Sequence, residues 1–123
     1  MVRVIIVEDD AQFRVALGLT LKRMGADVLA EIADGQAALE WLNRQHPDLI
    51  LTDCQMPRLD GIALVRRLRA RGDQTPVIMI SGQTEERIIK IALAAGVDQY
   101  LAKPFSTPML QAAIERTVPG WAA

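Results

Sequence analysis

The sequence predicts an α/β domain organised around a five-stranded parallel sheet. Five short apolar runs alternate along the chain with five segments in which apolar residues recur every three or four positions. Repeated alternation of this kind is typical of parallel strands joined by right-handed crossovers, with helices on both faces of the sheet. At 123 residues, the chain is long enough to bury the core of one such domain.

The five apolar runs have the length and the β-branched composition of buried strands. The expected strands are 2–7, 28–32, 49–52, 77–80 and 99–102. Five βα units favour the doubly wound strand order 2-1-3-4-5, which is flavodoxin-like. In that order the first and third strands are neighbours, and a crevice opens at their carboxyl ends.

The helices are expected at 11–24, 36–45, 62–71, 84–95 and 107–117. Most are preceded by a side chain that can accept a hydrogen bond from the backbone of the first turn. These expected caps are Asp10, Asp34, Asp60 and Thr84. Gly25 and Gly96 stand where the first and fourth helices should stop.

The composition is that of an ordinary globular domain, with 50% hydrophobic and 24% charged residues. A formal net charge of −1 offers no basic surface for nucleic acid, and no apolar run reaches membrane-spanning length. The single cysteine, Cys54, excludes an intramolecular disulfide and fits a reducing cytosol, so we expect a cytoplasmic protein. By strand alternation Cys54 points away from the side on which Asp53 lies, and we interpret it as a small buried hydrophobic residue.

Polar side chains stand where four of the expected strands end. Glu8 and Asp9 follow the first strand, Asp53 the third, Ser81 the fourth and Lys103 the fifth. The carboxyl ends of parallel strands meet at one edge of a sheet, so these side chains should converge there. Because the strand bodies are almost wholly apolar, this concentration of polar groups indicates a functional site.

The residue types at this edge predict metal-assisted phosphoryl chemistry. Three carboxylates packed together repel one another unless a cation lies among them. Hard oxygen ligands with room for water suit Mg²⁺, with Mn²⁺ as an alternative, better than Ca²⁺ or Zn²⁺. With the metal bound, Asp53 could attack a phosphoryl group and become an aspartyl phosphate. The Lys103 ammonium would neutralise charge on the transferring oxygens, and Ser81 could donate a hydrogen bond to one of them.

Four short motifs occupy these strand ends, in order along the chain. They are Val7-Glu8-Asp9-Asp10, Asp53-Cys54-Gln55-Met56-Pro57-Arg58-Leu59-Asp60-Gly61, Ile80-Ser81-Gly82 and Tyr100-Leu101-Ala102-Lys103-Pro104-Phe105. Together they resemble the landmarks of a response-regulator receiver domain of two-component signalling. The resemblance runs from Val4 to about Val118, so we expect a receiver domain over 1–118 and a C-terminal tail or the start of a linker over 119–123.

The resemblance implies a phosphoacceptor and a set of metal ligands. Asp53 would accept phosphate from a sensor histidine kinase or a histidine phosphotransfer protein. Asp9 and Asp53 would ligate Mg²⁺ directly, whereas Glu8 would act through a bound water. The main-chain carbonyl of Gln55 would be a further ligand.

The resemblance also implies a switch. The side chains of Ser81 and Lys103 would engage the phosphoryl group. Tyr100 falls at the position of the family's switch aromatic, which turns inward when the serine moves toward the phosphate; an edge-strand aromatic without that role is the alternative. Lys103-Pro104 resembles the family's cis peptide. The output face would comprise the fourth helix, fifth strand and fifth helix, with mixed charge from Glu85, Glu86, Arg87 and Lys90.

The first helix carries a second apolar row outside its buried stripe. Val15 and Leu19, spaced by four, form this row, and with Phe13 they are expected to help dock the phosphodonor. The alternative is an apolar helix surface without a partner. Downstream, the domain either acts as a stand-alone receiver through protein contacts or belongs to a longer chain with a linked effector domain. We expect no contact of this domain with nucleic acid or membrane.

Three other functions share part of these features. A haloacid-dehalogenase-like phosphatase has similar residues but carries its nucleophile after the first strand, where this chain has Glu8-Asp9-Asp10. A flavodoxin-type flavin carrier needs a phosphate-cradling loop there, and three acids would repel the phosphate. A receiver-like scaffold that is never phosphorylated should lack an acid or Lys103, and none is missing. We therefore expect a phosphoacceptor signalling domain that catalyses only its own phosphoryl transfer and slow self-dephosphorylation.

Overall fold

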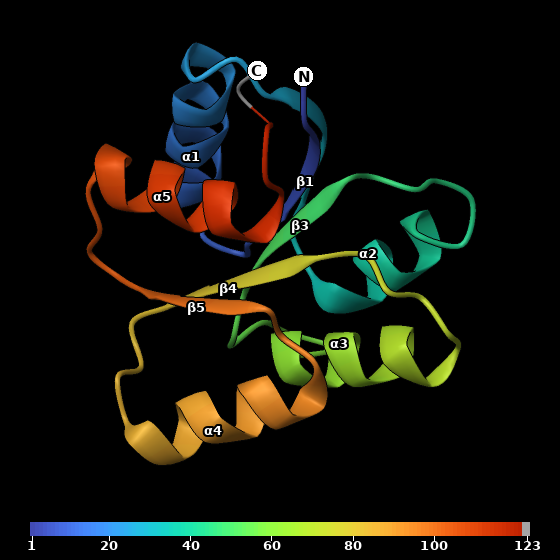
Figure 1. Ribbon diagram of the computed structural model, residues 1–123. Helices are drawn as coiled ribbons and strands as arrows, with labels where there is room; N and C mark the ends of the chain where they lie inside the picture. The colour runs from blue at the N-terminus through green and yellow to red at the C-terminus, as the bar shows by residue number, and fades with distance from the viewer. Residues whose placement is uncertain (122–123) are drawn as a thin grey trace.

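Five parallel strands form a single sheet in the order β2-β1-β3-β4-β5 (Figure 1). The computed structural model describes residues 1–121. The strands are β1 Arg3–Val7, β2 Asp27–Ile32, β3 Leu49–Asp53, β4 Val77–Ser81 and β5 Gln99–Ala102. The predicted fold class and strand order are confirmed, because the alternation of apolar runs with amphipathic segments leaves few other ways to bury both faces of the sheet.

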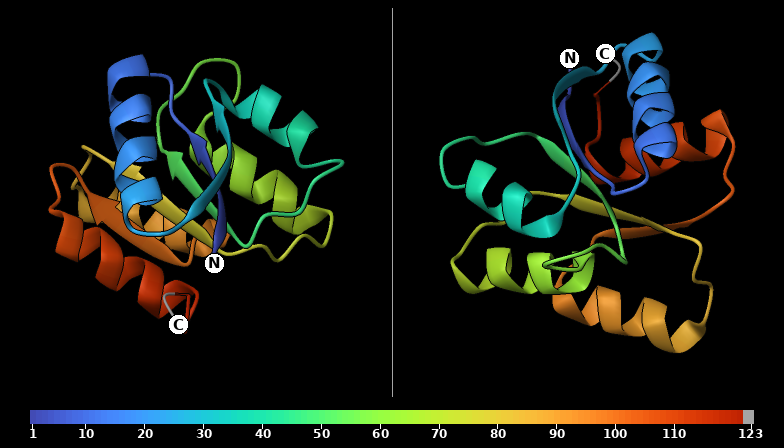
Figure 2. Two further views of the ribbon diagram at one scale, coloured as in Figure 1. Left: turned by 90° about the horizontal axis from the view of Figure 1, so that it is seen from above. Right: turned by 180° about the vertical axis from the view of Figure 1, so that it is seen from behind.

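The helices divide between the two faces of the sheet (Figures 1 and 2). The elements α1 Ala11–Arg23 and α5 Thr107–Thr117 cover one face. The elements α2 Gly35–Trp41, α3 Gly61–Ala70 and α4 Glu86–Ala95 cover the other face. None of the helices that the structure describes combines the length and the apolar character needed to cross a bilayer.

Two hydrophobic clusters lie on the opposite faces of the sheet. Val4 and Ile6 of β1 point into the cluster under α1 and α5, whereas Ile5 and Val7 point into the cluster under α2, α3 and α4. All four side chains are fully buried, as expected for a central strand whose residues alternate between two covered faces. The strand bodies therefore supply the core, and polar side chains are left to the strand ends.

Three of the expected helix caps are confirmed. The Asp10 carboxylate accepts hydrogen bonds from two backbone N–H groups of the first turn of α1. Asp34 and Asp60 each accept one such bond at the starts of α2 and α3. These contacts satisfy N–H groups that a helix cannot pair internally.

Two helix boundaries differ from the prediction. The helix expected from residue 84 begins at Glu86, and Thr84 is not its cap. The reason is tertiary: Gln83 donates its N–H to Ser81 Oγ and accepts the Tyr100 hydroxyl at its carbonyl, which holds this stretch in the loop. The helix expected to reach residue 45 ends at Trp41, because the following turns tighten before Pro47, a residue that disfavours helix immediately ahead of it.

Trp121 packs against the α1 and α5 side of the core, although the sequence placed it in a tail or linker. Its side chain is 7% exposed and joins the hydrophobic cluster of that face. Residues 122–123, the end of the expected tail, lie outside the described residues. The boundary of the functional domain at Val118 stays a prediction.

Two leucines of α1 provide a matched test of core packing. Leu21 is 0% exposed and Leu19 is 49% exposed on the same helix. Leu21→Ala should lower the free energy of unfolding by about 2–5 kcal/mol, because it leaves a cavity in a packed core. Leu19→Ala should change it by less than about 0.5 kcal/mol. Urea denaturation followed by circular dichroism measures both, and equal losses would contradict the assigned faces of the helix.

Candidate functional site

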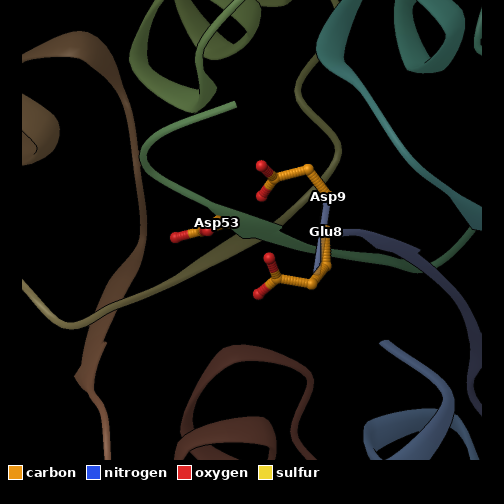
Figure 3. Close-up of side chains that lie close together, drawn as sticks. All are labelled: Glu8, Asp9 and Asp53. Atoms are coloured by element: carbon orange, nitrogen blue, oxygen red, sulfur yellow. The ribbon is translucent and has the colours of Figure 1, made fainter. Parts of the chain in front are cut away.

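Three carboxylates meet at the carboxyl edge of the sheet. Glu8 and Asp9 follow β1, and Asp53 ends β3, the strand next to β1. One oxygen from each carboxylate lies within 4.8 Å of the others (Figure 3). Glu8 is buried, Asp53 is half-buried and Asp9 is exposed, so the cluster opens to solvent on the Asp9 side.

Lys103, the first residue after β5, brings a positive charge to this cluster. Its ammonium donates a hydrogen bond to Glu8 Oε1 at 2.8 Å and lies 3.7 Å from Asp53 Oδ2. The other Glu8 oxygen accepts the backbone N–H of Asp10 at 3.2 Å. A buried carboxylate is tolerated only when its oxygens are paired in this way, so Glu8 and Lys103 depend on each other.

The Asp53 side chain is held by its own backbone. Its Oδ1 accepts the N–H of Cys54 at 2.7 Å, which directs Oδ2 toward Lys103. The side chain of Cys54 is buried in the cluster on the opposite face, which confirms its interpretation as a small hydrophobic residue. Burial, with the negative charges of Asp60 and Asp53, raises the pKa of the Cys54 thiol.

The polar groups at the edge lie on two faces of the sheet. Glu8, Asp53 and Lys103 continue the alternation of the residues that face α1 and α5. Ser81 ends β4 with the alternation of the opposite face, where Tyr100 packs. Ser81 is buried and accepts the Gln83 N–H at Oγ.

Tyr100 of β5 is half-buried and its hydroxyl donates to the main-chain carbonyl of Gln83 at 2.7 Å. Burial is the main cause that raises the pKa of Tyr100 above its usual value. The hydroxyl therefore stays protonated and keeps its role as a donor at neutral pH. The loop that leaves Ser81 is thus tied both to Ser81 and to Tyr100.

The loop between β3 and α3 is anchored at its two ends. Gly61 donates its N–H to the Cys54 carbonyl at 2.8 Å, and a Cβ at this position would collide with the main-chain oxygen of Asp53. Arg58 has a left-handed backbone conformation, with φ of 68°, and pairs with both oxygens of Asp34 at 2.9 and 3.0 Å. Gln55 lies inside this anchored loop.

The pKa of Asp34 reflects its contact with Arg58 of that loop. The backbone N–H of Ala37 and the Arg58 guanidinium lower the pKa of Asp34. The left-handed conformation of a residue other than glycine costs roughly 1–2 kcal/mol. The paired guanidinium offers an interaction that helps to offset this cost.

The sequence did not reveal the aromatic surroundings of Lys103. The Lys103 ammonium lies over the ring of Phe13, 4.2 Å from its centroid. The Phe105 ring meets Phe13 edge to face, with centroids 6.0 Å apart. The sequence assigns Phe13 to the apolar surface expected to dock the phosphodonor and does not connect it with Lys103. The available signal was an aromatic residue in the first helical turn after the acidic end of the first strand. The Lys103–Pro104 peptide bond next to this contact is cis.

The donor set fits a hard divalent cation. Carboxylate oxygens from three residues gather at one open edge, and no histidine or cysteine belongs to the group that the described residues form. Such an all-oxygen set with solvent on one side suits Mg²⁺ better than Zn²⁺. Asp53, the half-buried member of this set, lies 3.7 Å from the Lys103 ammonium, and a carboxylate with a neighbouring ammonium supplies what is needed to accept a phosphoryl group.

The doubly wound parallel sheet, with an acidic cluster and a lysine at its carboxyl edge, is the arrangement expected of a receiver domain. The sequence profile of the response regulator receiver domain matches residues 4–115. The chain therefore belongs to the response regulator receiver family, whose members serve two-component signalling. That membership argues against the phosphatase and the flavin carrier.

Similar curated proteins include regulators that are longer than this chain. The chain is 38% identical over 114 residues to the transcriptional regulatory protein AfsQ1 of Streptomyces coelicolor, a match covering 93% of this chain and 50% of that protein. It is 42% identical over 102 residues to the regulator of RpoS of Escherichia coli, covering 83% and 30%. The chain thus spans about half or less of the length of these relatives.

Solved structures agree on the fold. The receiver domain of a Francisella response regulator has a TM-score of 0.89 and 32% identity, covering 95% of this chain and 96% of that one. The receiver domain of a sensor histidine kinase from Pseudomonas aeruginosa has a TM-score of 0.85 and 33% identity, covering 94% and 96%. The latter is described with a magnesium ion coordinated in its active-site cleft.

Gly61 tests how tightly the loop holds Asp53. In Gly61→Ala the new Cβ meets the Asp53 carbonyl, and either this loop or the end of β3 must shift. We expect a loss of about 1–3 kcal/mol in the free energy of unfolding. Changes in amide chemical shifts should centre on Asp53 and Cys54.

Gly82→Ala is the matched control. A Cβ on Gly82 meets no heavy atom within 4 Å, and Gly82 has no left-handed backbone conformation. Its urea midpoint should stay close to that of the wild type. Similar midpoints for Gly61→Ala and Gly82→Ala would show that the loop is not packed against Asp53 as described.

Proposed function

We propose that this domain is a phosphoryl-accepting receiver in a two-component phosphorelay and that Asp53 is its phosphoacceptor. The observation that carries the proposal is the position of Asp53 Oδ2, 3.7 Å from the Lys103 ammonium and beside the Glu8 and Asp9 carboxylates. Oδ1 is held by the Cys54 N–H, so Oδ2 is the oxygen available for attack. The donor is a sensor histidine kinase or a histidine phosphotransfer protein.

In the proposed reaction Asp53 Oδ2 attacks the phosphorus of a phosphohistidine. The new O–P bond forms as the P–N bond breaks, and the electron pair leaves on the imidazole nitrogen. Lys103 has three N–H donors and can turn from Glu8 toward the incoming phosphoryl oxygens. Ser81 Oγ, buried at the end of β4, would donate a hydrogen bond to another of these oxygens.

The residues that would hold Mg²⁺ are Asp9 and Asp53 directly, Glu8 through a water, and the Gln55 main-chain carbonyl. Both Glu8 oxygens already accept hydrogen bonds, which supports a water-mediated role for this residue. The bound metal, with Mn²⁺ as an alternative, would neutralise negative charge on the phosphoryl oxygens. The magnesium ion described for the Pseudomonas receiver domain supports the same cofactor here.

The proposed switch couples Ser81 to Tyr100 through the loop between β4 and α4. Gln83 bonds to both residues, so a movement of Ser81 toward the phosphoryl group would disturb the contact of the Tyr100 hydroxyl. The affected surface is the α4–β5–α5 face, where Glu86 and Lys90 form an exposed ion pair at 3.1 Å. A surface of mixed charge fits a protein partner or a linked effector domain.

The proposed activity is stoichiometric self-modification and not turnover of an external substrate. One Asp53 accepts one phosphoryl group, and slow self-dephosphorylation resets the domain. The unpaired thiol of Cys54 supports action in the reducing cytoplasm.

The exposed row on α1 is proposed to dock the phosphodonor. Val15 and Leu19 are 52% and 49% exposed and border an apolar depression with Ala11, Gln12 and Ala16. This row begins one turn beyond the acidic cluster, since Asp10 caps the helix. A helix that presents a phosphohistidine to Asp53 would therefore cover it.

Intact mass spectrometry after treatment with acetyl phosphate tests the phosphoacceptor. Wild-type protein should gain one phosphoryl group in the presence of Mg²⁺ and far less in EDTA, because the metal offsets the charge of the acidic cluster. Asp53→Asn should gain none, since an amide oxygen is not a nucleophile here.

Three results would contradict the proposal. Absence of labelling in the wild type would favour the unphosphorylated scaffold. Labelling of Asp53→Asn equal to that of the wild type would place the acceptor elsewhere. Repeated release of phosphate from a small ester with Mg²⁺ would support phosphatase activity instead.

Leu19→Glu tests the docking row. A phosphorylated histidine kinase that labels the wild type should label this variant about tenfold more slowly, because a charge replaces apolar contact at a small interface. Acetyl phosphate should label it at the wild-type rate. Leu93→Glu is the matched control, since Leu93 is 47% exposed on α4 on the opposite side of the sheet (Figure 1). Equal slowing with both phosphodonors would refute the docking role.

A further inference from the structure

The ring of Phe13 forms one wall around the Lys103 ammonium. The ammonium is 4.2 Å from the ring centroid, 2.8 Å from Glu8 Oε1 and 3.7 Å from Asp53 Oδ2. The side chain of Lys103 is 24% exposed, so the contact is partly shielded from water. A cation at this distance from an aromatic face is attracted by the electron density of the ring.

The ring itself is fixed from two sides. Phe13 lies in the first turn of α1, and its backbone N–H is bound by the Asp10 side chain that caps the helix. The Phe105 ring packs against it edge to face, at an interplanar angle of 82°. The cap therefore fixes the backbone of Phe13, and its ring cannot turn away from Lys103 without losing the contact with Phe105.

The ion pair with Glu8 does not by itself keep the Lys103 ammonium within reach of Asp53. A lysine side chain has four rotatable bonds, and holding its end in one place costs conformational entropy. The hydrogen bond to Glu8 draws the ammonium away from Asp53, where it would be needed once a phosphoryl group arrives. Attraction to the ring face does not depend on which N–H group points at the ring, so the ammonium can turn its N–H groups from Glu8 toward Asp53 and stay over the face.

We propose that Phe13 is a positioning residue for phosphoryl transfer: its ring holds the Lys103 ammonium within reach of the phosphoryl group on Asp53. This inference rests on the proposed function of Asp53 and Lys103. Phe13 touches neither the acceptor oxygen nor the donor in this role. It acts through Lys103, and its contribution depends on the electrons of the ring face as well as on its volume.

A series of fluorinated phenylalanines at position 13 separates the two contributions. Mono-, di- and trifluorophenylalanine withdraw electron density from the ring face stepwise while nearly preserving its size. The rate of labelling by acetyl phosphate at saturating Mg²⁺ should fall steadily along the series, by about threefold to tenfold at the trifluoro ring. The apparent affinity for beryllofluoride, a phosphoryl mimic, should fall in parallel.

Two side-chain replacements complete the design. Phe13→Leu keeps an apolar side chain without a ring face and should label more slowly. Phe13→Tyr keeps the ring face and should be labelled at the wild-type rate. Thermal midpoints of all variants are measured beside the rates. A further readout needs neither metal nor phosphate: the methylene protons next to the Lys103 ammonium should show a ring-current shift in the wild type that is lost in Phe13→Leu.

The possible outcomes separate a failure of the role of Phe13 from a failure of the proposed function of Asp53. In one outcome the wild type is labelled at Asp53, but the labelling rates stay flat along the fluorine series or follow only the thermal midpoints. This result would overturn the role of Phe13 and leave the phosphoacceptor intact. Equal rates for Phe13→Leu and Phe13→Tyr would do the same. A wild type that takes up no phosphoryl group would refute the proposed function and the role of Phe13 together.

Discussion

The ion pair between Glu8 and Lys103 is the interaction on which the organisation of this edge depends. A carboxylate as deeply buried as Glu8 is costly unless it is paired, and its partner comes from the far end of the chain. The pair joins the end of β1, the neighbour of β3, to the end of β5, which lies beyond β4. Asp53 at the end of β3 lies beside this pair, with one oxygen held and the other facing the ammonium. The apolar bodies of β1, β3 and β4 make this arrangement rigid, because these strands are packed between the two clusters.

The alternation of side chains along the strands separates two tasks. Glu8, Asp53 and Lys103 belong to the face covered by α1 and α5, the side on which a phosphodonor would approach. Ser81 and Tyr100 belong to the other face, where α4 packs and where the proposed output begins. Residues on the two faces are thus separated only by the sheet itself. In the proposed switch, side chains at this edge and the loop that starts at Ser81 would move.

Much of this organisation can be predicted from the sequence, because the signals are local. Strand bodies and three aspartate caps follow from short stretches of chain, and the strand order follows from the alternation of five such strands with helices. The contacts that escaped prediction are those between distant segments. The start of α4 depends on bonds from Gln83 to Ser81 and Tyr100, and the ring of Phe13 meets Lys103 only after the sheet has formed. Trp121 looked like part of a tail because only the folded core offers it a place.

The anchoring of the loop after β3 has a consequence for how such domains can vary. Arg58 reaches Asp34, and a side chain on Gly35 would collide with the Leu59 carbonyl. The turn that begins α2 and the loop that would carry a metal ligand therefore form one composite part, although twenty-four positions separate Asp34 from Arg58. A transplanted loop would lose its shape unless this turn were transferred with it. An insertion after β2 would lie outside every acidic motif. It would still displace the loop after β3 and so disturb the residues around Asp53.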